Sequence, residues 1–230
     1  MKMTIKRNPY FFSAGFTLVE MAVVLVIVGL LIAAFLTPLS AQRDLRDYSE
    51  SRARLEQIRE ALYGYAIING KLPCSTTTTD PTDNVNYGHG DAACLLTAAA
   101  GVLPWKDLNV SAVDSWSSPR SQAVDPWTGY WVYRVDPAFT TSFSLTTTAS
   151  ANIDLLKSDG TSQTIAAERA VAVICTTGKD RVANGQNASF ETVNPIYQDD
   201  TISPAFDDMC IWITRPSLFN RMVVAGKLPQ

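Results

Sequence analysis

The sequence contains little of what enzymes use for catalysis. Histidine occurs once, at His89, and there is no GxSxG nucleophile motif and no glycine-rich phosphate-binding loop. Catalytic sites are built from a nucleophile beside a base, or from carboxylates paired in a pocket. The adjacent acids Asp199-Asp200 and Asp207-Asp208 are more typical of solvated turns. We therefore predict that the chain is not an enzyme.

A basic excess is also missing. Lys and Arg total 19 against 22 Asp and Glu, so the formal net charge is -3. Nucleic-acid-binding domains present a basic surface to phosphates, so general nucleic-acid binding is disfavoured. The charge is unevenly distributed, because residues 1–15 carry three basic residues and no acid, which leaves 16 basic against 22 acidic groups in residues 16–230. A positive leader thus precedes an acidic body.

Residues 21–42 carry no charge, and residues 21–36 read MAVVLVIVGLLIAAFL. With its flanks, this run approaches the roughly 20 apolar residues that a membrane-spanning helix needs. A secretory signal would place small residues after its apolar core, whereas here the small residues 13–15 come before it. Basic residues ahead of a spanning helix favour a cytoplasmic N-terminus. We predict a single-pass anchor with the body of the chain on the outer side.

A carboxylate, Glu20, lies within this apolar stretch. An unpaired carboxylate costs about 2.5 to 3.5 kcal/mol at the centre of a membrane helix and less near its end. One interpretation places Glu20 shallow enough to reach the lipid headgroups. The other gives it a positive partner, since a buried charge is tolerated when another charge meets it.

The local string favours the second interpretation. Residues 15–20, GFTLVE, followed by an apolar helix, resemble the class III leader of type IV prepilins and type II secretion pseudopilins. The resemblance covers roughly residues 1–40. It implies cleavage between Gly15 and Phe16 by prepilin peptidase, and N-methylation of the new Phe16 amine. It also implies that Glu20 pairs with the N-terminal amine of a neighbouring subunit in a filament.

The same resemblance implies partners and a change within the helix. Helices of this family are often loosened in the filament between a glycine and a proline, here matched by Gly29 and Pro38. Both residue types are also common in membrane helices for other reasons. The implied partners are homologous pilin or pseudopilin subunits, prepilin peptidase, an inner-membrane assembly platform and, before assembly, the lipid bilayer.

Residues 43–70 predict a second, amphipathic half of the helix. Leu55, Ile58, Leu62 and Tyr65 fall on one helical stripe, and charged residues fill the other faces. We expect this stripe to pack under the chain's own head, and the alternative is a contact with a cofactor or a partner helix. An asparagine-glycine pair at the end of this range is typical of a helix end. The helix of about 50 residues, at about 1.5 Å each, is near 80 Å long if unbroken.

Residues 71–230 predict a β-rich head, and the whole chain an α+β, pilin-like fold with a long N-terminal helix on an antiparallel sheet. A short C-terminal helix is expected over residues 218–225, between Ser217 and Gly226. The predicted strands are residues 130–135, 142–148, 152–156, 169–177 and 210–214. The predicted segments are the cleaved leader 1–15, the transmembrane and polymerisation helix 16–42, the spine 43–70 and the head 71–230.

Four cysteines lie in this head, where disulfides persist outside the cytoplasm. Of three possible pairings we favour Cys74 with Cys94, closing a Thr-, Asp- and Gly-rich loop, and Cys175 with Cys210, which lie in predicted strands. No CxxC or paired histidine spacing points to zinc. The second pair resembles the C-terminal disulfide loop of many type IV pilins, which major pseudopilins usually lack.

Other segments resemble landmarks of major pseudopilins, whose C-terminal loop binds calcium. They are residues 103–105, 125–130 and 177–180, followed by Asp207-Asp208 and Trp212. Calcium takes six to eight oxygen ligands. Candidate ligands are Asp180, Asn184, Asn187, Asp207 and Asp208. The alternative is a solvated loop held by local turns.

The sequence thus predicts a prepilin-like structural subunit. It is processed, N-methylated and polymerised into a type II secretion pseudopilus or a type IV pilus, serving protein secretion. The alternatives are a minor type IV pilin for pilus assembly, adhesion or motility, and a membrane-tethered periplasmic binding module. The expected location is the bacterial inner membrane, with the head in the periplasm, and then the filament.

Overall fold

The computed structural model describes residues 15, 17–76, 78–83, 85–94, 100–116, 129–190 and 194–228, without the side chains of residues 33–41. The chain divides into two compact units, residues 1–46 and 47–230. The elements in chain order are α1 (Leu18–Asn69), β1 (Gly101–Val102), α2 (Trp105–Leu108), β2 (Val132–Val135), the 3₁₀ helix η1 (Pro137–Phe139), β3 (Asp154–Leu156), β4 (Ala170–Thr176), the 3₁₀ helix η2 (Gly185–Ser189), β5 (Ile196–Gln198), β6 (Met209–Thr214) and α3 (Arg215–Val224).

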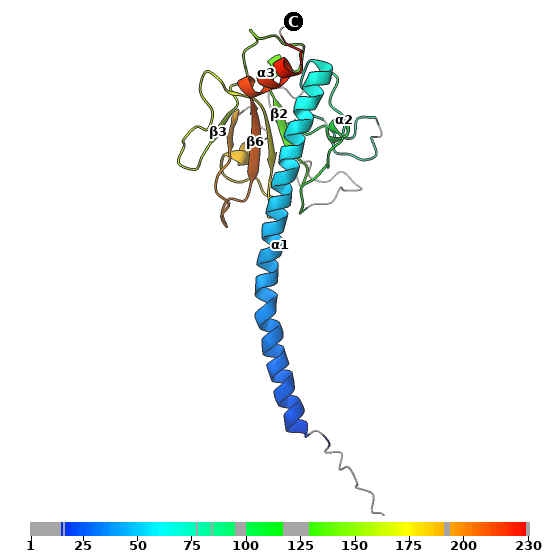
Figure 1. Cartoon of the computed structure of the whole chain (residues 1–230), viewed down its shortest axis with the longest axis vertical. Helices are drawn as coiled ribbons and strands as arrows, with labels where there is room; N and C mark the ends of the chain where they lie inside the picture. Colours follow the sequence, from blue (N-terminus) through cyan, green and yellow to red (C-terminus); the bar gives the residue numbers. More distant parts are fainter. Residues whose placement is uncertain are drawn as a thin grey trace, which may run out of the picture. The chain divides into compact units, whose positions relative to one another are not determined.

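Helix α1 begins in the first unit and ends in the second (Figure 1). Its backbone continues through Pro38 without interruption. The helix ends where the sequence predicts, because Gly70 adopts the left-handed conformation at φ +69° and its N–H donates to the Ala66 carbonyl at 2.8 Å. Of the predicted stripe, Leu55 and Leu62 are fully buried, and Tyr65 packs at the edge of the same cluster.

A four-stranded antiparallel sheet forms the centre of the second unit, in the order β1-β2-β4-β6. The residue 47–69 part of α1 lies along one face of this sheet, as Figure 1 shows, and α3 packs on the same side. The Tyr63 hydroxyl donates to Ser217 Oγ at 3.0 Å, and Arg221 of α3 pairs with Glu60 at 2.8 Å. The predicted α+β class, with an antiparallel sheet and an N-terminal helix, is confirmed and is consistent with a pilin-like fold.

Strand β4 is buried along its whole length because the sheet is covered on both faces. Ile174 points into the cluster that includes Leu55 and Leu62, whereas Val173 and Cys175 point into a second cluster with β3 and β5. This explains why the sequence of β4 is continuously apolar rather than alternating.

Strands β3 and β5 form a separate parallel pair, with Leu155 opposite Tyr197. Of the two, only the β3 region was expected from sequence, together with the turn at residues 158–160 that follows it. Tyr197 is 1% exposed and stacks on Phe190 with ring centroids 5.7 Å apart. The pairing joins segments about forty residues apart in the sequence, so no local sequence pattern indicates it.

The prediction of a strand over residues 142–148 is wrong. This segment is an irregular turn in which Ser144 N–H donates to Thr147 Oγ1 at 3.0 Å and Thr147 N–H donates to the Ser144 carbonyl at 3.0 Å. Serine and threonine hydroxyls compete for backbone groups and stabilise turns, which overrides the β-propensity of threonine here. Phe143 is nevertheless buried, so the segment still contributes to the core.

The C-terminal helix starts earlier than predicted. It spans Arg215–Val224, and its N-cap is Thr214, whose hydroxyl accepts the N–H of Ser217. Pro216 follows in the first turn, where a missing N–H costs nothing. The predicted cap at Ser217 is therefore a first-turn residue. The expected stop is confirmed, since Gly226 has φ +69°.

Candidate functional site

The N-terminus of α1 is closed by a reciprocal set of hydrogen bonds between Thr17 and Glu20. The Glu20 carboxylate accepts the Thr17 backbone N–H at 2.9 Å and its hydroxyl at 3.0 Å. In return, the Glu20 N–H donates to Thr17 Oγ1 at 3.2 Å. This is a capping box, which satisfies backbone donors that the first turn of a helix leaves without partners. The only acidic residue of the apolar segment is thus held by its own chain.

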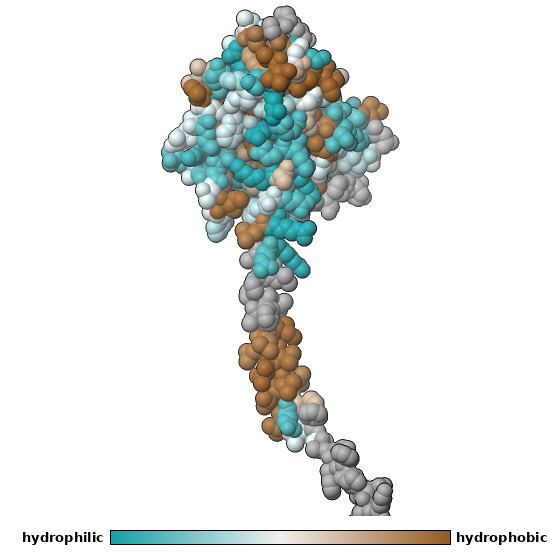
Figure 2. Space-filling view, in the orientation of Figure 1, coloured by the Kyte–Doolittle hydropathy of each residue, from teal (hydrophilic) through white to brown (hydrophobic). Residues whose placement is uncertain are grey.

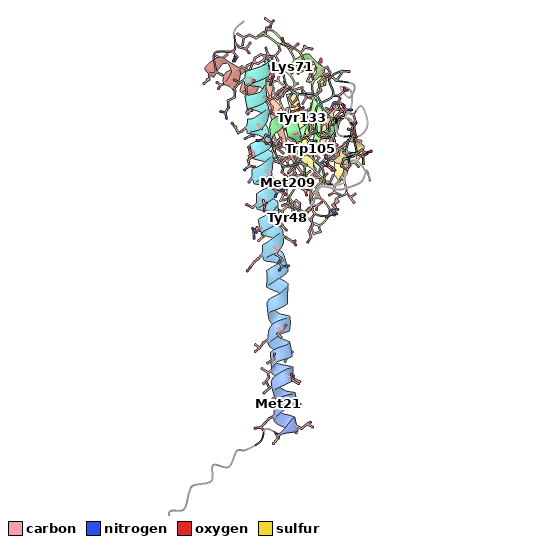
Figure 3. The ribbon with its side chains drawn as sticks, turned by 90° about the vertical axis from the view of Figure 1, so that its right-hand side faces the viewer. Met21, Tyr48, Lys71, Trp105, Tyr133 and Met209 are labelled. Atoms are coloured by element: carbon pink, nitrogen blue, oxygen red, sulfur yellow. A yellow bond between two sulfur atoms is a disulfide. The ribbon has the colours of Figure 1, made fainter. Side chains whose placement is uncertain are left out.

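The helix that follows presents apolar side chains on all sides. Every large apolar side chain described from Leu18 to Ile32 is between 43% and 86% exposed. Figure 2 shows this part of the helix as a continuous hydrophobic surface, and Figure 3 labels Met21 within it. A helix that is apolar all round needs apolar surroundings. Within the described residues, no helix reaches the length and apolarity needed for a membrane crossing.

Residues 12–36, which include the capping box and most of the apolar surface, match the family model described as the prokaryotic N-terminal methylation motif. The chain therefore carries a class III leader of the type IV prepilin and pseudopilin type. This leader implies processing by prepilin peptidase and assembly with other pilin subunits. No curated protein and no solved structure matches the chain.

The predicted residues of this prepilin-type segment lie as follows. Gly15 is exposed, and a Cβ added there would meet no atom within 4 Å. Phe16 lies outside the described residues. Gly29 also has open space around it, and Pro38 lies inside the uninterrupted α1. Cleavage at Gly15, methylation of Phe16 and loosening of the helix therefore stay predictions.

Sequence reasoning missed the role of Thr17. The signal was present, since a threonine followed three residues later by a glutamate is the pattern of a capping box at a helix start. The capping box fixes where Glu20 points, because both carboxylate contacts are made by one neighbouring residue.

Both favoured disulfides are present in the head. Cys74 is bonded to Cys94, and Cys175 of β4 to Cys210 of β6. Cys175 and Cys210 are directly opposite in the antiparallel register and fully buried. The predicted pairing is confirmed.

The acidic residues considered for calcium gather at the start of β6. Asp207 Oδ2 accepts the backbone N–H groups of Lys179 and Asp180 at 2.6 and 3.0 Å. Asp208 Oδ2 accepts the Asn184 N–H at 2.8 Å and Asn187 Nδ2 at 2.9 Å. The carboxylates thus hold the preceding loop by accepting its donors.

The second oxygen of each carboxylate, Oδ1, takes no part in these hydrogen bonds. Among the described residues, Oδ1 of Asp207 and Oδ1 of Asp208 are buried without a hydrogen-bond partner. The loop approaches closely because Gly178, at φ +65°, has no side chain, and a Cβ there would lie 2.4 Å from the Asp207 carbonyl. The described residues contain no group of three or more His, Cys, Asp or Glu side chains arranged to hold a metal ion.

Burial changes the protonation of this pair. Desolvation raises the pKa of Asp208 to about 7, and it also raises the pKa of Asp207, with nearby Asp180 adding repulsion. At neutral pH the site therefore carries less negative charge than its three acids suggest.

This pKa shift predicts a pH-dependent stability. Between the unfolded pKa near 4 and the folded value of about 7, the folded head keeps a proton on Asp208 that the unfolded chain has lost. The stability that this bound proton gives the folded head is therefore lost as the pH rises from about 4 to about 7. We expect Asp208→Asn to gain stability relative to wild type from pH 4 to pH 7, by on the order of a few kcal/mol. Melting temperatures of both proteins in chelator test it, and parallel pH profiles would contradict it.

Proposed function

We propose that this chain is a structural subunit of a type II secretion pseudopilus or a type IV pilus, with protein secretion as its main role. In this proposal, prepilin peptidase cuts between Gly15 and Phe16 and the new Phe16 amine is methylated. The apolar part of α1 holds the subunit in the bacterial inner membrane, with the head in the periplasm, until an assembly platform inserts it into the filament.

The observation that carries the proposal is the apolar surface of α1 directly after the methylation motif. Twelve large apolar side chains from Leu18 to Ile32 are exposed, and only lipid or other apolar helices would cover them favourably. A filament core of packed subunit helices is such an environment. The methylation motif marks pilin-like structural subunits, so we assign the protein a mechanical role and no catalysis.

Glu20 has two successive partners in this proposal. In the free subunit its carboxylate is hydrogen-bonded to Thr17, which lowers the cost of carrying it into apolar surroundings. Cleavage creates a positively charged amine on Phe16. In the filament, the amine of a neighbouring subunit meets the Glu20 carboxylate, and the charge pair sets the register between helices.

A deletion strain tests this function. We expect loss of secreted proteins from the culture medium with normal surface pili and twitching, restored by the wild-type gene. The matched control is a Gly15→Leu variant. It alters the predicted cleavage site and keeps the sequence of the head unchanged. Normal secretion in the deletion strain would contradict the secretion role.

A minor type IV pilin is the second candidate, and the Cys175–Cys210 disulfide favours it. A disulfide close to the C-terminus is similar to that of many type IV pilins. Under this alternative the deletion strain loses surface pili and keeps its secreted proteins, so one experiment separates the two roles.

We also propose that the loop at Asp207 and Asp208 binds calcium. Their two buried, unpartnered Oδ1 atoms supply the kind of oxygen that calcium prefers, with Asp180 beside them. Bound calcium would supply positive charge to these desolvated carboxylates.

The calcium proposal predicts a stabilisation that depends on pH. We expect millimolar calcium to raise the melting temperature of the full chain at pH 7, and to do so less at pH 5, where Asp208 holds a proton. Magnesium serves as the control cation, because its small octahedral shell fits such loops poorly. An unchanged melting temperature on adding calcium or chelator would contradict calcium binding at this loop.

A further inference from the structure

Strand β6 is the last strand of the sheet, and its outer side carries open main-chain groups. The Cys210 N–H points away from β4, because it donates to the Asp199 carboxylate at 3.0 Å. Main-chain groups of an antiparallel strand alternate between its two sides, so Trp212 turns its N–H and C=O to the same outer side. Within the described residues, neither of these two groups has a hydrogen-bond partner there.

A cavity of about 420 Å³ lies against this outer side of β6. Arg52, Arg59 and Tyr63 of α1 line one wall, and Gln163 and Asp199 line the other. The cavity is lined by Cys210, Ile211, Trp212 and Thr214, so it follows β6, which runs beside the head part of α1 in Figure 1.

A second cavity of about 320 Å³ adjoins the first at Arg52 and Glu56, which line both. It is more apolar, with Tyr48, Ile202 and Met209 among its lining residues. Figure 3 labels Tyr48 on α1 and Met209 close to it. The two cavities form one groove along β6, here called the β6 groove, with an apolar end at Met209 and a polar end at Thr214.

The helix wall of the β6 groove carries one unmatched positive charge. Arg59 forms an ion pair with Glu56. Arg52 has no ion-pair partner among the described residues and acts on Asp199 only through longer-range attraction. The Asp199 carboxylate is itself occupied by the Cys210 N–H.

We propose that the β6 groove binds an extended peptide segment that carries a carboxylate side chain, added as a further strand on β6. The main chain of the peptide pairs with the outward N–H and C=O of Trp212, as in other cases of strand addition. Alternate side chains of the added strand face opposite walls. A carboxylate on the helix side meets Arg52.

Asp199 limits how far this strand extends. Its carboxylate occupies the outward N–H of Cys210, as edge-protecting side chains do in other sheets. The open part of the edge therefore begins at Trp212. This binding does not depend on filament assembly and is measured separately from it.

Synthetic peptides test the proposal on the full processed chain in detergent. The probes are acetylated and amidated six-residue peptides of alternating valine and glutamate, and the same peptide with lysine in place of glutamate. We expect the glutamate peptide to bind about tenfold more tightly. In Arg52→Gln, the two affinities should come within about twofold. Equal binding of both peptides to wild type would overturn the carboxylate preference.

The strand pairing has its own matched variants. Trp212→Pro removes the outward N–H, which an edge strand tolerates, whereas Trp212→Val loses the same ring and keeps the N–H. We expect Trp212→Pro to lose binding at least tenfold relative to Trp212→Val, with similar melting temperatures.

A modified peptide tests strand addition on the wild-type protein, so this test does not depend on how a variant folds. Alternate N-methylation of the glutamate peptide should abolish its binding to wild type, because methylated amides cannot pair with β6. Undiminished binding of the methylated peptide would overturn strand addition. Absence of peptide binding, together with self-association that Trp212→Pro removes, would overturn the peptide in favour of a second copy of the chain.

Discussion

Glu20→Ala will insert into the membrane and fold its head, but far less of it will enter the filament. The head is unaffected because the Glu20 carboxylate hydrogen-bonds, among the described residues, only to Thr17. Hydrogen bonds to a charged group contribute about 1.5 to 3 kcal/mol, and we expect incorporation to fall about tenfold to a hundredfold. The measurement is the amount of subunit in sheared filaments relative to the amount in membranes.

Two further variants separate the charge of Glu20 from its capping role. Glu20→Gln keeps an oxygen that accepts from Thr17 and loses the negative charge, so it should fail to assemble like alanine. Thr17→Val removes the capping hydroxyl and keeps the charge, so it should assemble with a smaller defect. Normal incorporation of Glu20→Ala would remove the proposed assembly role. Equal defects in all three variants would assign the effect to the helix start and not to the charge.

Removing the Cys175–Cys210 disulfide will destabilise the head more than removing Cys74–Cys94. The two bonds span 35 and 20 residues, so loop entropy alone gives about 4 and about 3 kcal/mol. The difference grows because Cys175 and Cys210 are fully buried, and alanines in their place leave unfilled volume in the core.

Urea unfolding of the two double-alanine variants, followed by tryptophan fluorescence, measures this order. Unfolding of wild type with and without reductant gives the sum of both effects and serves as the control. A Cys74→Ala/Cys94→Ala variant that is the less stable of the two would show that the half-buried loop disulfide matters more than the buried one.

Local signals in the sequence were enough for α1 and for three strands of the central sheet. The end of α1 at Gly70 and the buried stripe at Leu55 and Leu62 follow from residue types and helical spacing. The strands β2, β4 and β6 were predicted to within about two residues, because they are the most apolar β-rich runs of the head.

The remainder depends on contacts between distant segments. The parallel pairing of β3 with β5 and the position of β6 at the sheet edge follow from tertiary arrangement alone. The raised pKa of Asp208 has the same origin, since adjacent aspartates usually face solvent and this one is buried. The turn at Ser144 is a different case, where local hydroxyl bonding overrode threonine's preference for strands.

The position of the buried disulfide limits how the head can come apart under mechanical load. Strand β6 and helix α3 are the last two described elements, so a force applied beyond α3 would detach α3 first and then separate β6 from β4. Unzipping would proceed one main-chain hydrogen bond at a time and stop at Cys210, which is covalently tied to Cys175 on the central strand. A subunit strained from that end would lose its last strand and still retain a closed core to which that strand can return.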